Sequence, residues 1–151
     1  AREQVTISNG LAWSPDGRTL YYVDSPTRRV QAFDFDGERG ELHRARVAFS
    51  LGADDGWPDG CCMDAAGCLW LAHWGAGKVT RWDPAAGRRL LTVKLPVTNV
   101  TSCAFAGPAL DRLFVTTAAP DAPGAAPEPE AGFLFTLDAG VTGLPVPVFT
   151  L

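Results

Sequence analysis

The segment Gly56-Trp57-Pro58-Asp59-Gly60 indicates a repeat, because its pattern resembles that of Ser8-Asn9-Gly10. Each is a short polar stretch followed by apolar residues, a turn and an apolar strand. A third copy begins at Thr101, so the copies start 50 and 42 residues apart, counted from Asn9 to Asp59 and from Asp59 to Thr101. That spacing is typical of the four-stranded units of a β-propeller.

The strands that follow each start also align. Short runs rich in aromatic and aliphatic residues occupy 20–24, 69–73 and 113–117, and a further set occupies 30–34, 79–83 and 134–138. Turn residues connect the first strand of a unit to its second, as in Ser14-Pro15-Asp16-Gly17 and Asp64-Ala65-Ala66-Gly67. Fourth strands are expected at 45–50 and 89–95. Because no segment keeps a helical period with caps, we predict an all-β chain with about twelve strands in three sheets.

These alignments define one domain, residues 1–151, made of three units at about 8–50, 57–96 and 99–151. Residues 118–131 are rich in Pro, Ala and Glu and are expected to form a long exposed loop in the third unit. Trp13, Trp70 and Trp82 recur at strand positions and are expected to pack between units.

Composition narrows the function classes. The net charge of −4 argues against a nucleic-acid partner, and no apolar run is long enough to span a membrane. The spacing of the four cysteines matches no metal-binding motif. We interpret them as buried free thiols, which are typical of a reducing compartment, and therefore predict a cytoplasmic protein. No serine-hydrolase elbow or zinc-protease motif is present.

Asn9 and Asp59 are the candidate site residues. An amide oxygen and a carboxylate at equivalent places in radially arranged repeats can converge on one point and hold a hard divalent cation. Taken alone, Pro58-Asp59-Gly60 and Asn9-Gly10 are also ordinary turn signals. Asp59 and Asn9 are expected just before the first strand of their units. Asp16, in the similar Pro-Asp-Gly sequence, falls between the first and second strands and is expected to serve only the turn.

Other polar residues are expected to have mainly structural roles. Asp54 and Asp55 are expected to be a solvated loop pair, and His73 to have a structural role at the end of a strand. Thr101 and Ser102 occupy the third copy of the site position and could offer a hydroxyl group to substrate or water.

The order of several long motifs resembles the C-terminal half of the SMP-30/gluconolactonase/regucalcin-like family. They are SNGLAWSPDG, LYYVDSPTRRVQAFDFD, GWPDGCCMDAAGCLWLAHWGAGKVTRWDP, LPVTNVTSCAFAGPALDRLFVTTAA and GFLFTLDAGVTGLPVPVF, which together cover almost the whole chain. The resemblance implies a six-bladed β-propeller, of which this chain would be about three blades. It further implies hydrolysis of sugar lactones with one divalent cation in the central channel.

Matched to the family's motifs, Asn9 and Asp59 correspond to two metal ligands, and Asp59 is the candidate catalytic residue as a possible base. The family's third ligand, a glutamate, and its sugar-binding residues come from blades outside this chain, so the substrate-binding residues are unknown. Oxygen ligands favour Ca²⁺, Mg²⁺ or Mn²⁺, with Zn²⁺ less natural. The alternative function is a non-catalytic propeller fragment, acting as a calcium-binding or interaction module. The expected partners are a sugar lactone and either a second copy or the missing N-terminal half.

Overall fold

The protein is nearly all β-structure, as the sequence predicts. The computed structural model describes residues 3–120, 124 and 126–145. In this part of the chain the helices are two single 3₁₀ turns, η1 (Ser25–Thr27) and η2 (Ala53–Asp55). Every strand pairs antiparallel with its neighbour in the sheet, and apart from the long segment between β10 and β11 the strands of one sheet are joined by short turns.

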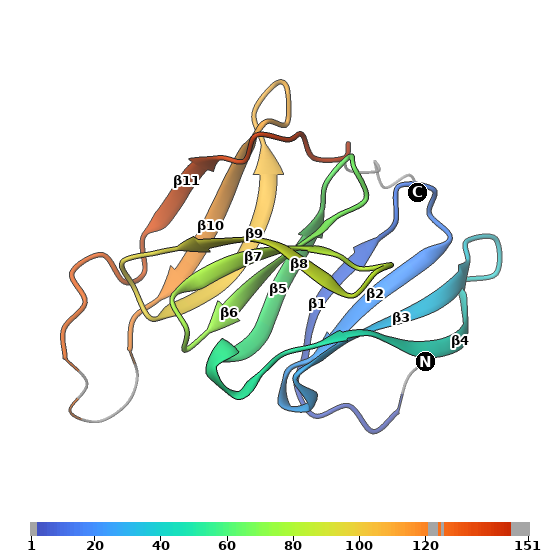
Figure 1. Ribbon diagram of the computed structural model, residues 1–151, viewed down its shortest axis with the longest axis horizontal. Coiled ribbons are helices and arrows are strands. Elements are labelled where there is room, and N and C mark those ends of the chain that lie inside the picture. The colour runs from blue at the N-terminus through green and yellow to red at the C-terminus, as the bar shows by residue number, and fades with distance from the viewer. Residues whose placement is uncertain (1–2, 121–123, 125, 146–151) are drawn as a thin grey trace.

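The strands form three sheets (Figure 1). The first sheet contains, in order, β1 (Ser8–Trp13), β2 (Thr19–Asp24), β3 (Arg29–Asp36) and β4 (Glu41–Ser50). The second contains β5 (Trp57–Met63), β6 (Leu69–Trp74), β7 (Lys78–Asp83) and β8 (Arg88–Lys94). The third has β9 (Asn99–Ala106), β10 (Arg112–Ala118) and β11 (Leu134–Asp138).

The third sheet is shorter than a complete repeat would be. Eleven strands lie in the described residues, against about twelve expected. Residues 139–145 contribute only a bridge between Asp64 and Gly143, and residues 146–151 of the predicted third unit lie outside the described part. The predicted loop at 118–131 falls between β10 and β11, and its residues 121–123 and 125 are likewise outside it.

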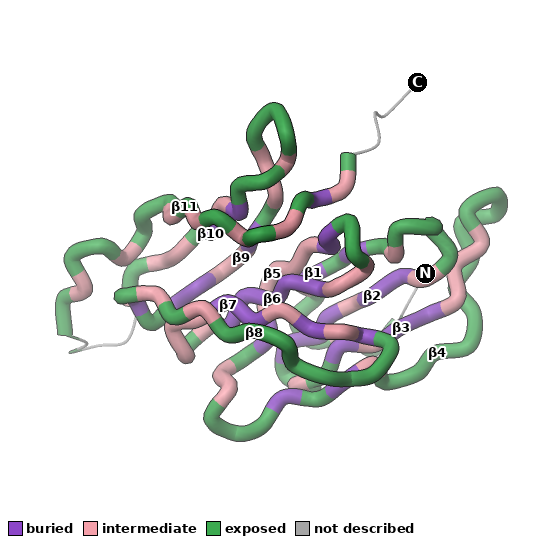
Figure 2. The backbone as a smooth tube through the Cα atoms, turned by 45° about the horizontal axis from the view of Figure 1, so that its top comes forward, coloured by how far each residue is buried: buried purple, intermediate pink, exposed green. Residues whose placement is uncertain are grey.

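The strand β6 of the middle sheet is buried on both faces, which explains its almost continuous apolar sequence. On β6, Leu69 and Leu71 belong to the core shared with the first sheet, whereas Trp70 and Ala72 belong to the core shared with the third. Figure 2 shows the contrast between this buried centre and the exposed strands β4 and β8. Among the described residues, the first and third sheets therefore each have one face without a neighbouring sheet.

Aromatic pairs join neighbouring sheets. Phe49 of β4 stacks on Trp82 of β7 at 4.1 Å between ring centroids, and Trp70 meets Phe105 of β9 edge-on at 6.0 Å. The expected packing of tryptophans between units is thus confirmed for Trp70 and Trp82. It is wrong for Trp13, which contacts Phe35 of its own sheet and is 39% exposed. Trp13 lies on the face that points away from the second sheet.

All four cysteines are free thiols. Only Cys103 is buried, while the other three are half-buried, so the expectation of buried thiols holds for one of them. The Sγ atoms of Cys62 and Cys103 lie 3.7 Å apart between the second and third sheets. Separately, among the described residues no helix has the length and apolar character needed to cross a membrane.

Candidate metal and substrate site

A β-bulge occurs at the same place in each sheet. Between β1 and β2 the register shifts at Asn9 and Gly10, between β5 and β6 at Asp59 and Gly60, and between β9 and β10 at Thr101. The sequence suggested that these residues precede the first strands. Instead they lie inside them, because an inserted residue is accommodated as a bulge that bends the strand and redirects a side chain.

Glycine follows the bulge residue where two sheets come closest. A Cβ atom placed on Gly10 would lie 2.6 Å from the carbonyl oxygen of Asp59, which is too close for any other residue type. The same construction on Gly60 would collide with Ser102 of the third sheet. The Asn-Gly and Asp-Gly pairs are therefore required by the approach of β1 to β5 and of β5 to β9, which lie side by side in Figure 1.

Ser25 connects the two candidate ligands. The Asn9 amide donates to the Ser25 hydroxyl (3.2 Å), and this hydroxyl donates to the Pro58 carbonyl (2.7 Å), one residue before Asp59. Ser25 is buried, and its contact links the first sheet to the strand that carries Asp59. With its nitrogen directed to Ser25, the Asn9 side chain keeps its carbonyl oxygen available as a metal ligand.

Asn9 and Asp59 line one cleft of about 410 Å³, together with Ser25 and five apolar residues: Ile7, Pro26, Trp57, Pro58 and Trp74. Burial raises the pKa of the Asp59 carboxyl, and the Asn9 side chain and the Gly60 backbone N–H partly oppose that shift. No lysine, arginine or histidine of the described residues forms an ion pair with Asp59. The structure therefore brings the two predicted ligands together on an accessible surface.

These residues fit part of a cation site. A half-buried carboxylate without a basic partner, beside an amide oxygen, is a suitable oxygen donor set for a hard divalent ion. The described residues contain no cluster of three or more His, Cys, Asp or Glu side chains that could hold a metal. This chain therefore offers two side-chain ligands, and further ligands would have to come from water or from other blades.

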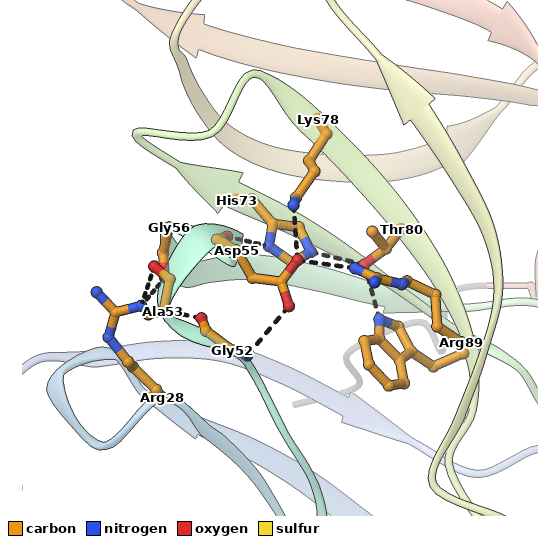
Figure 3. Close-up of polar contacts among 10 residues, drawn as sticks. Arg28, Gly52, Ala53, Asp55, Gly56, His73, Lys78, Thr80 and Arg89 are labelled. Carbon is orange, nitrogen blue, oxygen red and sulfur yellow. Dashed lines mark hydrogen bonds and ion pairs between the residues drawn. The ribbon is translucent and has the colours of Figure 1, made fainter.

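The loop before β5 is held from both sides (Figure 3). The Asp55 carboxylate accepts from Lys78 (2.6 Å) and Arg89 (2.7 Å), and it also accepts from the Gly52 backbone N–H. These charges hold the pKa of Asp55 well below its usual range, despite partial burial. The expectation that Asp55 is a solvated loop residue is wrong, whereas Asp54 is exposed. The network fixes the chain immediately before Trp57 and Asp59.

His73 belongs to this support. Its Nδ1–H donates to the Asp55 carbonyl (2.7 Å), and its Nε2 accepts from the Thr80 hydroxyl (2.6 Å), which in turn accepts from the Trp82 indole N–H (2.7 Å). Both ring nitrogens are thus used by a neutral imidazole inside the fold. These contacts give His73 the structural role expected from its place at the end of a strand.

Acid should destabilise the protein through His73. Burial lowers the pKa of His73 from 6.5 to about 4, so between these values the unfolded chain binds a proton that the folded chain does not. The stabilisation is complete above pH 6.5 and is lost as the pH falls toward 4, by roughly 3 kcal/mol in the free energy of unfolding. Urea unfolding at several pH values measures it. His73→Gln should flatten the dependence of the free energy of unfolding on pH in this range. His43→Gln, which replaces an exposed histidine, is the control and should not flatten it. Equal pH dependence in the two variants would contradict the role of His73.

The structure also bears on the predictions made for Asp16 and for Thr101 and Ser102. Asp16 is exposed and accepts from the Ser14 hydroxyl (2.6 Å) and the Arg18 backbone N–H (3.1 Å), as expected of a turn residue. Thr101 lies at the third bulge, but its hydroxyl pairs with that of Thr116 (2.7 Å), and neither Thr101 nor Ser102 lines the cleft.

Ser25 is the site residue that sequence reasoning missed. A signal existed, because Asp24-Ser25 aligns with His73-Trp74 and Thr117-Ala118 at the ends of the second strands. The structure pairs Asp24, His73 and Thr117 with the residues just before the three bulges. The residue after Asp24 is therefore adjacent to the bulge that carries Asn9.

Comparison with known proteins agrees with this geometry. The family described as SMP-30/Gluconolactonase/LRE-like region matches residues 1–119, which is more than half of the chain. The chain belongs to this family. It is 45% identical over 146 residues to regucalcin of Danio rerio, covering 95% of this chain and 50% of that protein.

Solved structures of SMP-30/gluconolactonase relatives superpose on the chain. A calcium-binding protein, regucalcin, from Agrobacterium tumefaciens gives a TM-score of 0.88 at 33% identity, over 97% of this chain and 50% of that one. A gluconolactonase from Xanthomonas campestris gives 0.63 at 35% identity, over 75% of this chain and 35% of that one. The predicted partial propeller of about three blades is confirmed, and the chain spans about half the length of the curated relatives it matches.

Proposed function

We propose that the chain supplies Asn9 and Asp59 to the centre of a divalent-metal-dependent sugar lactonase, whose remaining ligands come from other propeller blades. One observation carries the proposal. Two matched bulges in adjacent sheets direct an amide and a carboxylate without a basic partner into one cleft. Membership of the SMP-30/gluconolactonase family and the gluconolactonase relative from Xanthomonas campestris support the same reaction class.

The cleft residues suit ester hydrolysis. A divalent cation, when bound, supplies a Lewis acid that stabilises negative charge on the lactone carbonyl oxygen and lowers the pKa of a water molecule. The Asp59 carboxylate, which lines the cleft, would accept the proton of the attacking water as a general base. Asn9 would contribute a neutral oxygen, which neutralises less of the cation's positive charge than a carboxylate would. The lactone C–O bond breaks as water adds, giving a hydroxy acid.

The test is hydrolysis of glucono-1,5-lactone by this chain co-expressed with the remaining blades of a regucalcin relative. We expect turnover above the spontaneous rate with Ca²⁺, Mg²⁺, Mn²⁺ or Zn²⁺, loss of turnover with a chelator, and recovery when metal returns. The isolated chain should bind metal weakly, since hard cations take six or more oxygens and two side chains are offered here. Turnover that survives the chelator would contradict the proposal.

A second candidate is a calcium-binding or interaction module without turnover. The regucalcin of Agrobacterium tumefaciens, which resembles this chain closely, is described as a calcium-binding protein. The same experiment separates the two: tight metal binding by the completed propeller with no hydrolysis of any sugar lactone favours the module. A cytoplasmic location, which is predicted from the free thiols, is compatible with both candidate functions.

The isolated chain should also associate. Exposed apolar residues are Leu11, Trp13 and Val47 of the first sheet, Leu134 of the third, and Phe133 just before β11. Such surface favours a second copy or the missing blades. Light scattering after size exclusion should show a mass that rises with concentration and falls when the missing blades are added. A monomer at high concentration that binds no hydrophobic dye would contradict this.

A further inference from the structure

The cleft beside Asp59 has an apolar side that the proposed chemistry does not use. Five of its eight lining residues are apolar, and two of them, Trp57 and Trp74, are directly paired across β5 and β6. Trp57 stands two residues before Asp59 on the same strand, and both residues line the cleft. An aromatic surface therefore lies next to the candidate ligand.

The Trp57 ring is exposed but held in place. Its exposed fraction is 42%, and the guanidinium carbon of Arg28 lies 4.0 Å from the ring centroid. That guanidinium cannot swing away easily, because its Nη1 donates to the backbone carbonyls of Gly52, Ala53 and Gly56 at 3.0–3.1 Å (Figure 3). A cation over one ring face stabilises the aromatic group and fixes its plane.

The support of Arg28 is itself rigid. The loop whose carbonyls Arg28 binds is anchored on its other side by Asp55, which pairs with Lys78 and Arg89, and by the bond from His73 to the Asp55 carbonyl. An exposed tryptophan would ordinarily lose side-chain entropy when a ligand orders it. Here the contact with Arg28 restrains the ring before any ligand arrives, so a ligand placed on Trp57 keeps more of its contact energy.

We infer that Trp57 is the specificity-determining wall of the cleft and takes the apolar face of a cyclic ligand whose oxygens point to Asn9 and Asp59. Sugar rings have such a face, because their axial C–H groups form an apolar patch bounded by hydroxyls. The choice of a cyclic ligand rests on the proposed function. The inference goes further by predicting preference for sugar derivatives and lactones that carry an apolar substituent, since Trp57, Trp74, Ile7 and Pro26 extend the apolar wall.

The probes are methyl β-glucoside and phenyl β-glucoside, which share one ring and contain no ester. Binding to the 151-residue chain is followed by saturation-transfer NMR and by tryptophan fluorescence. The phenyl glucoside should bind about tenfold more tightly than the methyl glucoside. Trp57→Ala should abolish that difference, and Trp57→Phe should restore most of it. Trp13→Ala removes an exposed tryptophan outside the cleft and should leave both affinities unchanged.

Several outcomes would overturn the inference. They are equal affinity of the wild-type chain for both glucosides, no binding of either at millimolar concentration, and a preference that survives Trp57→Ala. Because the probes cannot be hydrolysed, this result is independent of lactonase activity. If the completed propeller hydrolyses lactones in a chelator-sensitive way but shows no preference that depends on Trp57, only the role of Trp57 is refuted. If the preference depends on Trp57 but the completed propeller has no turnover, only the proposed lactonase activity is refuted.

Discussion

Asp59→Ala is expected to lower kcat for lactone hydrolysis in the completed propeller by about a thousandfold or more. The substitution removes the charged ligand that this chain offers and, with it, the group placed to accept the proton of the attacking water. Asn9→Ala should weaken metal binding but keep more activity at saturating metal, because the lost ligand is neutral. Turnover as a function of metal concentration, with calorimetry of metal binding, separates these two effects.

Asp16→Ala is the matched control for Asp59→Ala. Both aspartates lie in a Pro-Asp-Gly sequence, but Asp16 is exposed and bonds only to its own turn. Its replacement should leave kcat and metal affinity nearly unchanged and should cost at most about 1 kcal/mol of stability. If Asp16→Ala reduced turnover as strongly as Asp59→Ala, the register that places Asp59 at a bulge and Asp16 in a hairpin would have no functional meaning.

The largest loss of stability is expected for Asp64→Ala. The Asp64 carboxylate is fully buried between β5 and β6, and it accepts from the Ala66 and Cys68 backbone N–H groups, from the Trp70 indole (3.0 Å) and from Arg81 (2.7 Å). Without it, four donors lose their acceptor, one of them a mostly buried guanidinium. Breaking a buried pair in this way costs about 3–5 kcal/mol. Urea unfolding followed by tryptophan fluorescence measures the loss.

Asp83→Ala is the control for this effect. Asp83 is the last residue of β7 and accepts from two backbone N–H groups, those of Ala85 and Ala86, but the described structure gives it no buried side-chain donor. Its loss should stay within about 1 kcal/mol. Asp64→Asn keeps the volume of the side chain and provides a measurable intermediate if Asp64→Ala does not fold. Similar unfolding midpoints for Asp64→Asn, Asp64→Ala and Asp83→Ala would contradict the role assigned to Asp64.

Sequence periodicity predicted the sheets and the convergence of Asn9 and Asp59, because both follow from local patterns. The alignment that equated Asn9, Asp59 and Thr101 is reproduced by three register shifts at those residues. The same alignment distinguished Asp59 from Asp16. Strand order within a sheet needed no long-range information, since each strand pairs with the next one along the chain.

The supports of the site could not be predicted, because their partners are distant in sequence. Asp55 looked like one of two solvated loop residues, but its partners Lys78 and Arg89 lie 23 and 34 residues away. Asp64 looked like an ordinary turn residue, and the burial that makes it essential depends on a donor 17 residues away. Ser25 acts on a carbonyl 33 residues ahead. A turn signal in the sequence is the same whether tertiary packing leaves the carboxylate exposed or encloses it.

The bulge that recurs in the three described sheets makes this position modular. Each of these sheets carries one residue at its bulge, where the ladder is already interrupted, so exchanging that residue changes the donor without disturbing the pairing of the strands. The third position holds Thr101, whose hydroxyl is turned to Thr116. Ligand number and charge can thus change one blade at a time during evolution. Metal preference and substrate polarity in such a protein are therefore free to diverge while the sheets and their cores remain the same.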